Sequence, residues 1–270
     1  MADRRRRTLI TVVGGLVVLA AAAWTTGGSA APQVHVRAKA TWVKHDLEYR
    51  RVQVRITRDG GSWTSAPLGT TYAVRPSVHV RDLDADGEPE VLLDTYTGGA
   101  HCCSVTYVFR YLPGSRRYAK TFHTFGNVGY SAKNVDGRER VELLTKDDRS
   151  AYVFTAYAAS FFPIQLWHVD DGRFVDVTRR FPGLVESDAN GLLTEYQRVR
   201  RERADVRGVL AAWLADQYLL RKEDAGWAKI DAAYRRGELG PREDLIGWPQ
   251  GRGYVKALRA FLVRTGYARA

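Results

Sequence analysis

Residues 78–93 read VHVRDLDADGEPEVLL and carry the strongest structural signal in the chain. Two short apolar runs, Val78–Val80 and Val91–Leu93, flank an acidic loop and predict a pair of strands. Within the loop, carboxylates occupy alternate positions, from which they can converge on one hard cation. These carboxylates belong to Asp82, Asp84 and Asp86. Gly87 follows them and allows the sharp turn that wraps such a loop around an ion.

The loop does not fit an EF-hand, although its carboxylate spacing is similar. The twelfth position of an EF-hand loop needs a bidentate Glu, and that position is Leu93. EF-hand loops also join helices, whereas both flanks here are strand-like. A solvated acidic turn between strands is the alternative to a metal site. Because exported proteins meet millimolar calcium, even a site with a dissociation constant of ~10⁻⁴–10⁻³ M would be filled.

The strand–acidic loop–strand arrangement resembles the FG-GAP and VCBS repeats of integrin-like β-propellers, where a D-x-D-x-D-G-x-x-D loop binds calcium. The resemblance implies Ca²⁺ as the cofactor. It assigns side-chain ligands to Asp82, Asp84, Asp86 and Glu90. It also implies that the backbone carbonyl of Glu88 is a further oxygen ligand. Glu90 stands where the repeats usually have Asp.

A second copy of this loop follows about fifty residues later, a period typical of propeller blades. Asn134–Gly137 can be laid over Asp84–Gly87. In that overlay the first ligand position is Ala132 and the last is Arg140, so we expect metal binding to be lost there. Residues 34–180 hold about three such units, fewer than the ~4–8 blades of a closed propeller. The prediction is therefore an incomplete propeller-like or sandwich-like assembly of antiparallel strands.

The rest of residues 34–180 has the same strand-like character. Val52, Val54 and Ile56 alternate with polar residues, the period-2 pattern of a half-buried strand. Asp170-Asp171-Gly172 predicts a tight hairpin, because Asp-Gly supplies the positive φ that such turns require. We count about ten short strands separated by turn residues at regular spacing, as in sandwiches, barrels and propellers.

The pattern changes near Pro182, where helical periodicity replaces alternation. Three amphipathic helices are predicted. Their apolar residues are Val206, Leu210, Trp213 and Leu214 in the first, Trp227, Ile230 and Tyr234 in the second, and Val255, Leu258, Phe261 and Leu262 in the third. The predicted fold class is α+β, with a signal segment at 1–30, a β-rich FG-GAP/VCBS-like domain at 31–182 and a helical region at 183–270.

The N-terminal segment predicts export. Arg4–Arg7 form a positive region, Thr8–Thr26 are uncharged and mostly apolar, and small residues follow at 27–31. Cleavage after Ala30 is the favoured interpretation. An uncleaved membrane anchor is the alternative, since the apolar stretch approaches the ~20 residues that span a bilayer. In either case the remaining chain lies outside the cytoplasm, secreted or at the cell envelope.

Cys102 and Cys103 are the only cysteines. Neighbouring Cα atoms are ~3.8 Å apart, whereas ordinary disulfides need ~4.4–6.8 Å, so these two residues can bond only as a strained eight-membered ring. Buried free thiols, intermolecular bonds and a metal site with His101 are the alternatives. With the ring closed, Tyr96 and His101 become ligand-contact candidates on a stiff loop. Residues 96–103 and 151–163 also look like those of secreted bacterial proteins with VCBS-like repeats.

The sequence holds no nucleophile elbow, zinc-ligand cluster or phosphate-binding glycine loop. It therefore favours a non-enzymatic, calcium-stabilised binding module associated with the cell envelope. A secreted hydrolase of glycan or another wall polymer is the alternative, with Asp94, Asp147, Asp148 and Asp170 as candidate acids. Solubility is the favoured interpretation of the net charge of +11, and an acidic polymer such as a wall phosphate is the alternative. The extracellular or cell-envelope ligand expected for the module is an acidic or glycan polymer, while export argues against nucleic acid.

Overall fold

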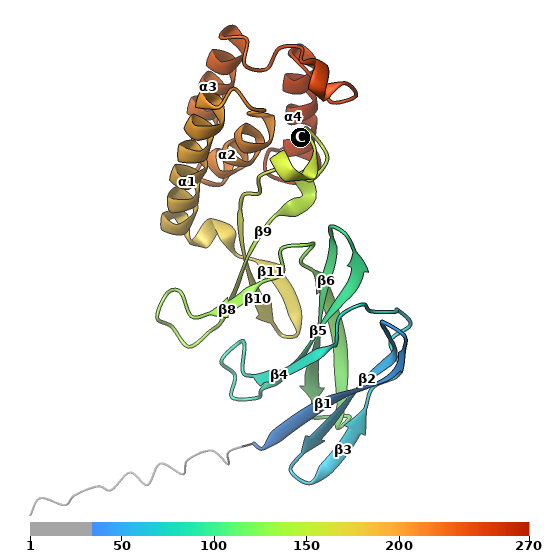
Figure 1. Ribbon diagram of the computed structural model, residues 1–270. Helices are drawn as coiled ribbons and strands as arrows, with labels where there is room; N and C mark the ends of the chain where they lie inside the picture. The colour runs from blue at the N-terminus through green and yellow to red at the C-terminus, as the bar shows by residue number, and fades with distance from the viewer. Residues whose placement is uncertain (1–33, 270) are drawn as a thin grey trace, which may run out of the picture. The chain divides into compact units, whose positions relative to one another are not determined.

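Strands fill the first part of the described chain and long helices the last part (Figure 1). The structure, a computed structural model, describes residues 34–269. The predicted signal segment at 1–30 lies outside these residues. Within 34–269, no helix is both long enough and apolar enough to cross a membrane.

The strands form three antiparallel sheets, in each of which strands adjacent in sequence are paired. The first sheet comprises β1 (Val36–His45), β2 (Glu48–Arg58) and β3 (Gly61–Thr64). The middle sheet comprises β4 (Ser77–Arg81), β5 (Glu90–Gly99), β6 (Cys102–Leu112) and β7 (Arg117–Thr124). The third sheet comprises β8 (Ser131–Lys133), β9 (Glu142–Lys146), β10 (Ile164–Asp170) and β11 (Arg173–Asp176). Each sheet has two free edges, so none closes into a barrel.

The alternation of apolar and polar residues in the sequence correctly predicts which side chains are buried in the sheets. Val52, Val54 and Ile56 in β2 are buried, while Arg55 between them is exposed. The predicted hairpin is also confirmed: Asp170 pairs with Arg173, and both residues of the two-residue turn have positive φ, 52° at Asp171 and 72° at Gly172.

Apolar contacts join neighbouring sheets. Val52, Val54 and Ile56 of the first sheet pack with Val91, Leu93 and Phe109 of the middle sheet. A second cluster joins the middle and third sheets, including the loops before β5 and β9. It contains Leu83, Leu92, Val108, Val141, Leu143 and Val169. The backbone N–H of Val141 also donates to the carbonyl of Leu83 at 3.1 Å. The loops before β5 and β9 are therefore in direct contact.

The helical region contains four α-helices, not the three that we expected. They are α1 (Pro182–Arg201), α2 (Arg207–Leu219), α3 (Glu223–Arg235) and α4 (Arg252–Arg264). The additional helix is α1. Figure 1 shows the other three grouped around α2, in which residues 207–217 are all buried. The one-sided amphipathic pattern expected for α2 is therefore wrong, because neighbours cover this helix on every side.

The connection between β9 and β10, residues 147–163, ties the sheets to the helices. Phe154 is buried in the helical core, with its ring centroid 5.4 Å from those of both Tyr254 and Phe261. Gly208 in α2 lies so close to this connection that a Cβ atom would be 2.1 Å from the carbonyl oxygen of Ala159. Only glycine permits that approach without a backbone shift.

Polar contacts reinforce the same junction. Lys146 at the end of β9 forms an ion pair with Asp188 of α1. The other oxygen of Asp188 accepts the backbone N–H of Ile164 at 2.9 Å. Tyr267, after α4, donates to Asp147 at 2.7 Å.

Candidate metal centre

The loop between β4 and β5 gathers the three aspartates of the acidic sequence. One carboxylate oxygen from each of Asp82, Asp84 and Asp86 lies within 4.8 Å of the other two. The three side chains differ in exposure: Asp84 is buried, Asp82 is half-buried and Asp86 is exposed. This arrangement matches the convergence expected from alternate positions in a tight loop.

Hydrogen bonds inside the loop fix its shape. Asp82 accepts two backbone N–H groups, from Ala85 at 2.8 Å and from Gly87 at 3.0 Å. Asp86 accepts the N–H of Glu88 at 2.8 Å. Ala85 and Gly87 both have positive φ, 63° and 83°, which lets the chain turn sharply around the carboxylates.

Glu90, the first residue of β5, lies outside the aspartate cluster and bonds back to the start of the loop. Its side chain is fully buried, and Oε2 accepts the backbone N–H of Leu83 at 3.0 Å. Its second oxygen, Oε1, has no hydrogen-bond partner in the structure. Asp84 is similar: Oδ2 accepts the N–H of Asp171 at 3.3 Å, and Oδ1 is buried without a hydrogen-bond partner among the described residues. Buried oxygens of this kind are rare, because each lacks the stabilisation that water would give it.

The electrostatics of the loop favour an additional positive charge. Burial, and after it the negative charges of the three aspartates, raise the pKa of Glu90 to about 8 against the opposing effect of the Leu83 N–H. Burial also raises the pKa of Asp84, and the neighbouring Asp86 adds to this shift. A cation would relieve both the repulsion and the desolvation.

Glu88 has a different role from the other acids. Its carboxylate forms an ion pair with Arg58 at the end of β2, which connects the loop to the first sheet. The side chain is therefore not part of the aspartate cluster. Only its backbone carbonyl is left for the ligand role that the sequence resemblance implies.

The loop between β8 and β9 is the structural counterpart of the acidic loop. Each loop has eight residues between its strands, and each is followed by a buried glutamate at the start of the next strand, Glu90 or Glu142. Glu142 accepts the N–H of Val135 at 2.8 Å, as Glu90 accepts that of Leu83. In both cases the glutamate bonds to the amide seven residues earlier.

This shared bond corrects the overlay made from sequence, which was wrong by two residues. Ala132 lies within β8 and pairs with Leu143, and Arg140 forms an ion pair with Asp170, so neither occupies a ligand position. The residues matching Asp82, Asp84, Asp86 and Glu90 are Asn134, Asp136, Arg138 and Glu142. The sequence overlay followed the Asp-Gly pair, whereas the structural register follows the buried glutamate.

The second loop supplies its own partners for the buried glutamate. Nε2 of His168, in β10, lies 2.8 Å from Oε1 of Glu142, the oxygen that is free in Glu90. Arg138 occupies the position of Asp86 and lies 3.5 Å from the carboxylate of Asp136. We still expect no metal in this loop, but for a different reason: Arg138 replaces one of the acidic ligands, and the imidazole of His168 contacts the buried glutamate.

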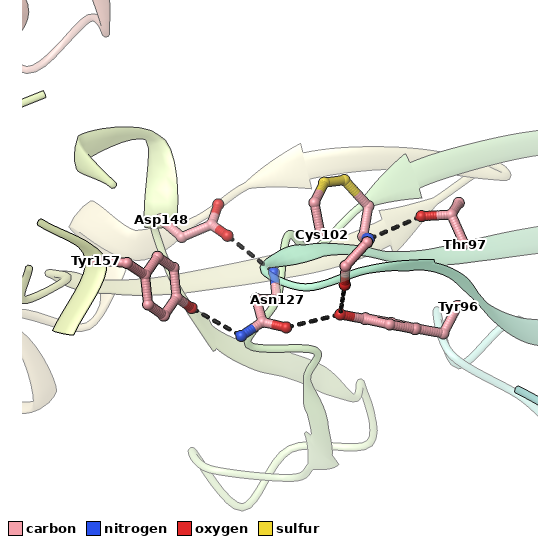
Figure 2. The surroundings of a disulfide bond; sticks show 8 residues. Tyr96, Thr97, Cys102, Asn127, Asp148 and Tyr157 are labelled. Carbon is pink, nitrogen blue, oxygen red and sulfur yellow. Dashed lines mark hydrogen bonds between the residues drawn. A yellow bond between two sulfur atoms is a disulfide. The ribbon is translucent and has the colours of Figure 1, made fainter. Parts of the chain in front are cut away.

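Cys102 and Cys103 are joined by a disulfide at the start of β6, through a cis peptide bond. Figure 2 shows the ring beside Thr97, whose hydroxyl accepts the N–H of Cys103 at 2.9 Å. Gly99 pairs with Cys102 across the turn. Of the alternatives considered from sequence, this structure contains the bonded vicinal pair.

Tyr96 and His101, the two ligand-contact candidates, lie against other parts of the protein. The Tyr96 hydroxyl is 2.6 Å from the carbonyl oxygen of Gly99 and 2.9 Å from Oδ1 of Asn127. Asn127 in turn donates to the Tyr157 hydroxyl at 2.8 Å, and its backbone N–H donates to Asp148 at 2.9 Å (Figure 2).

The ring of His101 stacks on that of Tyr157, with centroids 3.9 Å apart, and Nδ1 of His101 contacts the Tyr152 hydroxyl. The disulfide turn and these two residues therefore anchor the 147–163 connection. Sequence reasoning missed this partner, because the connection lies about fifty residues away and has no regular pattern.

The acids considered for glycoside hydrolysis have separate partners in the structure. Asp94 accepts from Thr106, Asp147 pairs with Arg149, Asp148 accepts from Asn127 and Asp170 pairs with Arg140. Asp94 also lines a cavity beside β4.

Comparisons with known proteins match the chain over both regions. Residues 185–266 match the family model described as the sll0997 C-terminal domain, which covers the helical region. The probable thylakoid lumen protein sll0997 of Synechocystis is 30% identical over 206 residues, which make up 72% of this chain and 61% of that protein. The uncharacterized protein y4bJ of Sinorhizobium fredii is 28% identical over 196 residues, 68% of this chain and 31% of that protein.

No solved structure matches the chain. The resemblance of the acidic loop to FG-GAP and VCBS repeats stays a prediction that these comparisons do not test. The chain spans less than two thirds of the length of either relative. Its similarity to the Synechocystis protein extends beyond the helical region into the sheets.

Proposed function

We propose that this chain is an exported, non-enzymatic binding module of the cell envelope, stabilised by one calcium ion in the loop of residues 82–90. The ion is held by Asp82, Asp84, Asp86 and Glu90, with the Glu88 carbonyl as a further ligand. The observation that carries the proposal is the pair of buried, unpartnered oxygens, Asp84 Oδ1 and Glu90 Oε1, beside the aspartate cluster. Several carboxylate oxygens around one loop are the donor set that Ca²⁺ prefers.

Two observations support export. Residues 4–31 have the charged, apolar and small-residue segments of a signal peptide. The similar Synechocystis protein is named as a probable protein of the thylakoid lumen, a compartment that proteins reach by crossing a membrane. An exported protein also meets enough calcium to fill a weak site.

Consecutive meander sheets support the FG-GAP/VCBS resemblance. The middle and third sheets each have four antiparallel strands in sequence order, as propeller blades do. Both carry the loop in question between their first and second strands. The proposed architecture is an incomplete propeller of three blade-like sheets, with the helical region as a separate cap.

Thermal unfolding with calcium and with chelator tests the proposal. Calcium at about 100 times its dissociation constant is expected to stabilise the fold by about 2.7 kcal/mol. Asp84→Asn should abolish this response, because it replaces the charge of the buried central ligand. Asp136→Asn, the equivalent change in the second loop, is the matched control and should leave the response intact. Identical melting curves with calcium and with chelator would refute the proposal.

A further inference from the structure

A cavity of about 810 Å³ lies beside the edge strand β4. Its walls come from β4 with the residues on either side of it, from β5 and β6, and from residues between 129 and 132 at the start of β8. The size is within the range of ~300–1,000 Å³ found for small-ligand pockets. None of the four residues proposed to hold calcium by their side chains lines the cavity.

The cavity contains a carboxylate that is held in place by three other elements. Asp94 in β5 accepts from Thr106 Oγ1 at 2.7 Å and from the Tyr130 hydroxyl at 3.0 Å, both at Oδ1. Its Oδ2 lies 3.4 Å from Nε2 of His79 in β4. Burial and the negative charge of Asp94 raise the pKa of Tyr130, so its hydroxyl remains a donor. Because a carboxylate offers about four acceptor sites, Asp94 retains capacity for a ligand hydroxyl.

The rim of the cavity is cationic. Arg75, before β4, and Arg81, at its end, line the cavity together with His79, and all three side chains are exposed. Within residues 34–269, neither arginine has a carboxylate within ion-pair distance: Arg75 lies over the ring of Trp42, and Arg81 donates only to the carbonyl of Ala132 at 3.4 Å. His79 and Arg81 point to the same face of β4, about 7 Å apart.

The remaining wall is apolar and aromatic. Val78, Leu83 and Leu92 line it, together with the rings of Tyr96 and Tyr130. Three kinds of surface thus meet in one cavity: an oriented acceptor, two unpaired guanidinium groups and apolar faces. A neutral sugar would leave the guanidinium groups unpaired, and a polyphosphate would bring no hydroxyl to Asp94. A sugar carrying carboxylates satisfies all three.

We propose that this cavity binds an acidic saccharide, with sugar hydroxyls donating to Asp94 and a carboxylate paired with Arg75 or Arg81. The inference rests on the proposed function in one respect: it names the ligand class of the binding module. It does not require the calcium ion, since the two sites have separate side chains.

Isothermal titration calorimetry of the full chain tests this assignment, with tetragalacturonic acid as the probe. Maltotetraose, which is neutral, and tripolyphosphate, which has no sugar hydroxyls, are the comparison ligands. Tetragalacturonic acid is expected to bind more tightly than either. Arg81→Ala and Asp94→Asn should each weaken binding about tenfold, as expected for the loss of one charge-assisted contact. Arg117→Ala removes an exposed arginine of β7 that does not line the cavity and should change nothing.

Asp94→Asn also alters the contacts of Thr106 and Tyr130, so Arg75→Ala provides a second variant on an exposed side chain. Absent binding of the acidic saccharide, equal binding of tripolyphosphate, or affinity unchanged in all the cavity variants would each overturn the assignment. Titrations with calcium and with chelator separate the two proposals. Saccharide binding without any effect of calcium on melting refutes only the calcium site, and the converse refutes only the saccharide site.

Discussion

The loops at 82–89 and 134–141 have the same length, and a buried glutamate follows each of them, but the carboxyl groups of the two glutamates have different partners. In the second loop, His168 contacts Oε1 of Glu142, and Arg138 brings a positive charge close to Asp136. In the first loop, Oε1 of Glu90 has no hydrogen-bond partner among residues 34–269, and the negative charges of Asp82, Asp84 and Asp86 raise the pKa of this glutamate. The difference teaches that the backbone shape does not require a metal. What distinguishes the first loop is that no side chain of residues 34–269 donates to the second oxygen of its glutamate.

The largest effect is expected from His168→Ala. It leaves Oε1 of Glu142 buried without a partner, and breaking a buried pair in this way costs about 3 kcal/mol. Chemical denaturation measures the loss, which should be the same with calcium and with chelator. His168→Gln keeps a donor and is expected to recover about half of it. A His168→Ala protein as stable as the parent would end the idea that the contact with His168 stabilises the buried Glu142.

The pH dependence of calcium binding separates the loops further. The raised pKa of Glu90, about 8, means that a proton occupies this ligand at lower pH and must be displaced. Affinity is therefore expected to fall by up to about tenfold per pH unit below 8 and to be constant above it. In chelator, the stability of the fold changes with pH in the opposite direction. The proton bound to Glu90 makes its full contribution to the free energy of unfolding below pH ~4.5, and this contribution is lost as the pH rises through about 8. Calcium titrations between pH 6 and 9 would show a flat affinity if Glu90 were not a ligand.

Glu90→Gln is expected to have a smaller effect on the metal-free protein, within about 1 kcal/mol. With a pKa of about 8, Glu90 is mostly neutral at pH 7, and the amide oxygen can still accept the Leu83 N–H. The calcium response should disappear. Denaturation in chelator and in calcium gives both results. A strong destabilisation in chelator would mean that the charged form of Glu90 already has a partner.

The smallest effect is expected from Arg138→Ala. Its side chain is 85% exposed, and exposed ion pairs contribute about 0–1 kcal/mol. Because His168 still contacts Oε1 of Glu142, this variant should gain no stabilisation by calcium. Calcium stabilisation of Arg138→Ala through the second loop would show that the arginine alone excludes the metal.

The strands and the acidic cluster could be predicted because their signals are local. Alternation at Val52–Ile56 reports one buried face, and Asp171-Gly172 reports a two-residue turn. The convergence of the three aspartates follows from their spacing alone. The register of the second loop could not be found in this way, since it depends on a glutamate that bonds seven residues back and on His168 from another strand.

The helices show which signals were overlooked and which were absent. In α1 the buried residues follow spacings of four and three after Pro182, a recognisable helical stripe. Its buried residues are Val185, Ala189, Leu192, Tyr196 and Val199. In α2 the unbroken apolar run 209–215 indicates a helix covered on all sides. The cavity at Asp94, in contrast, is formed by four segments that no local pattern brings together.

The connection between β9 and β10 is held at two points, three residues apart in sequence: Phe154 lies inside the helical core, and Tyr157 stacks on His101. Surface loops ordinarily accept insertions and deletions because few contacts depend on their length. Here a single added residue would shift one anchor relative to the other. We therefore expect this irregular stretch to tolerate insertions and deletions as poorly as a core strand does. Tags or reporter domains should be inserted into other loops of the molecule.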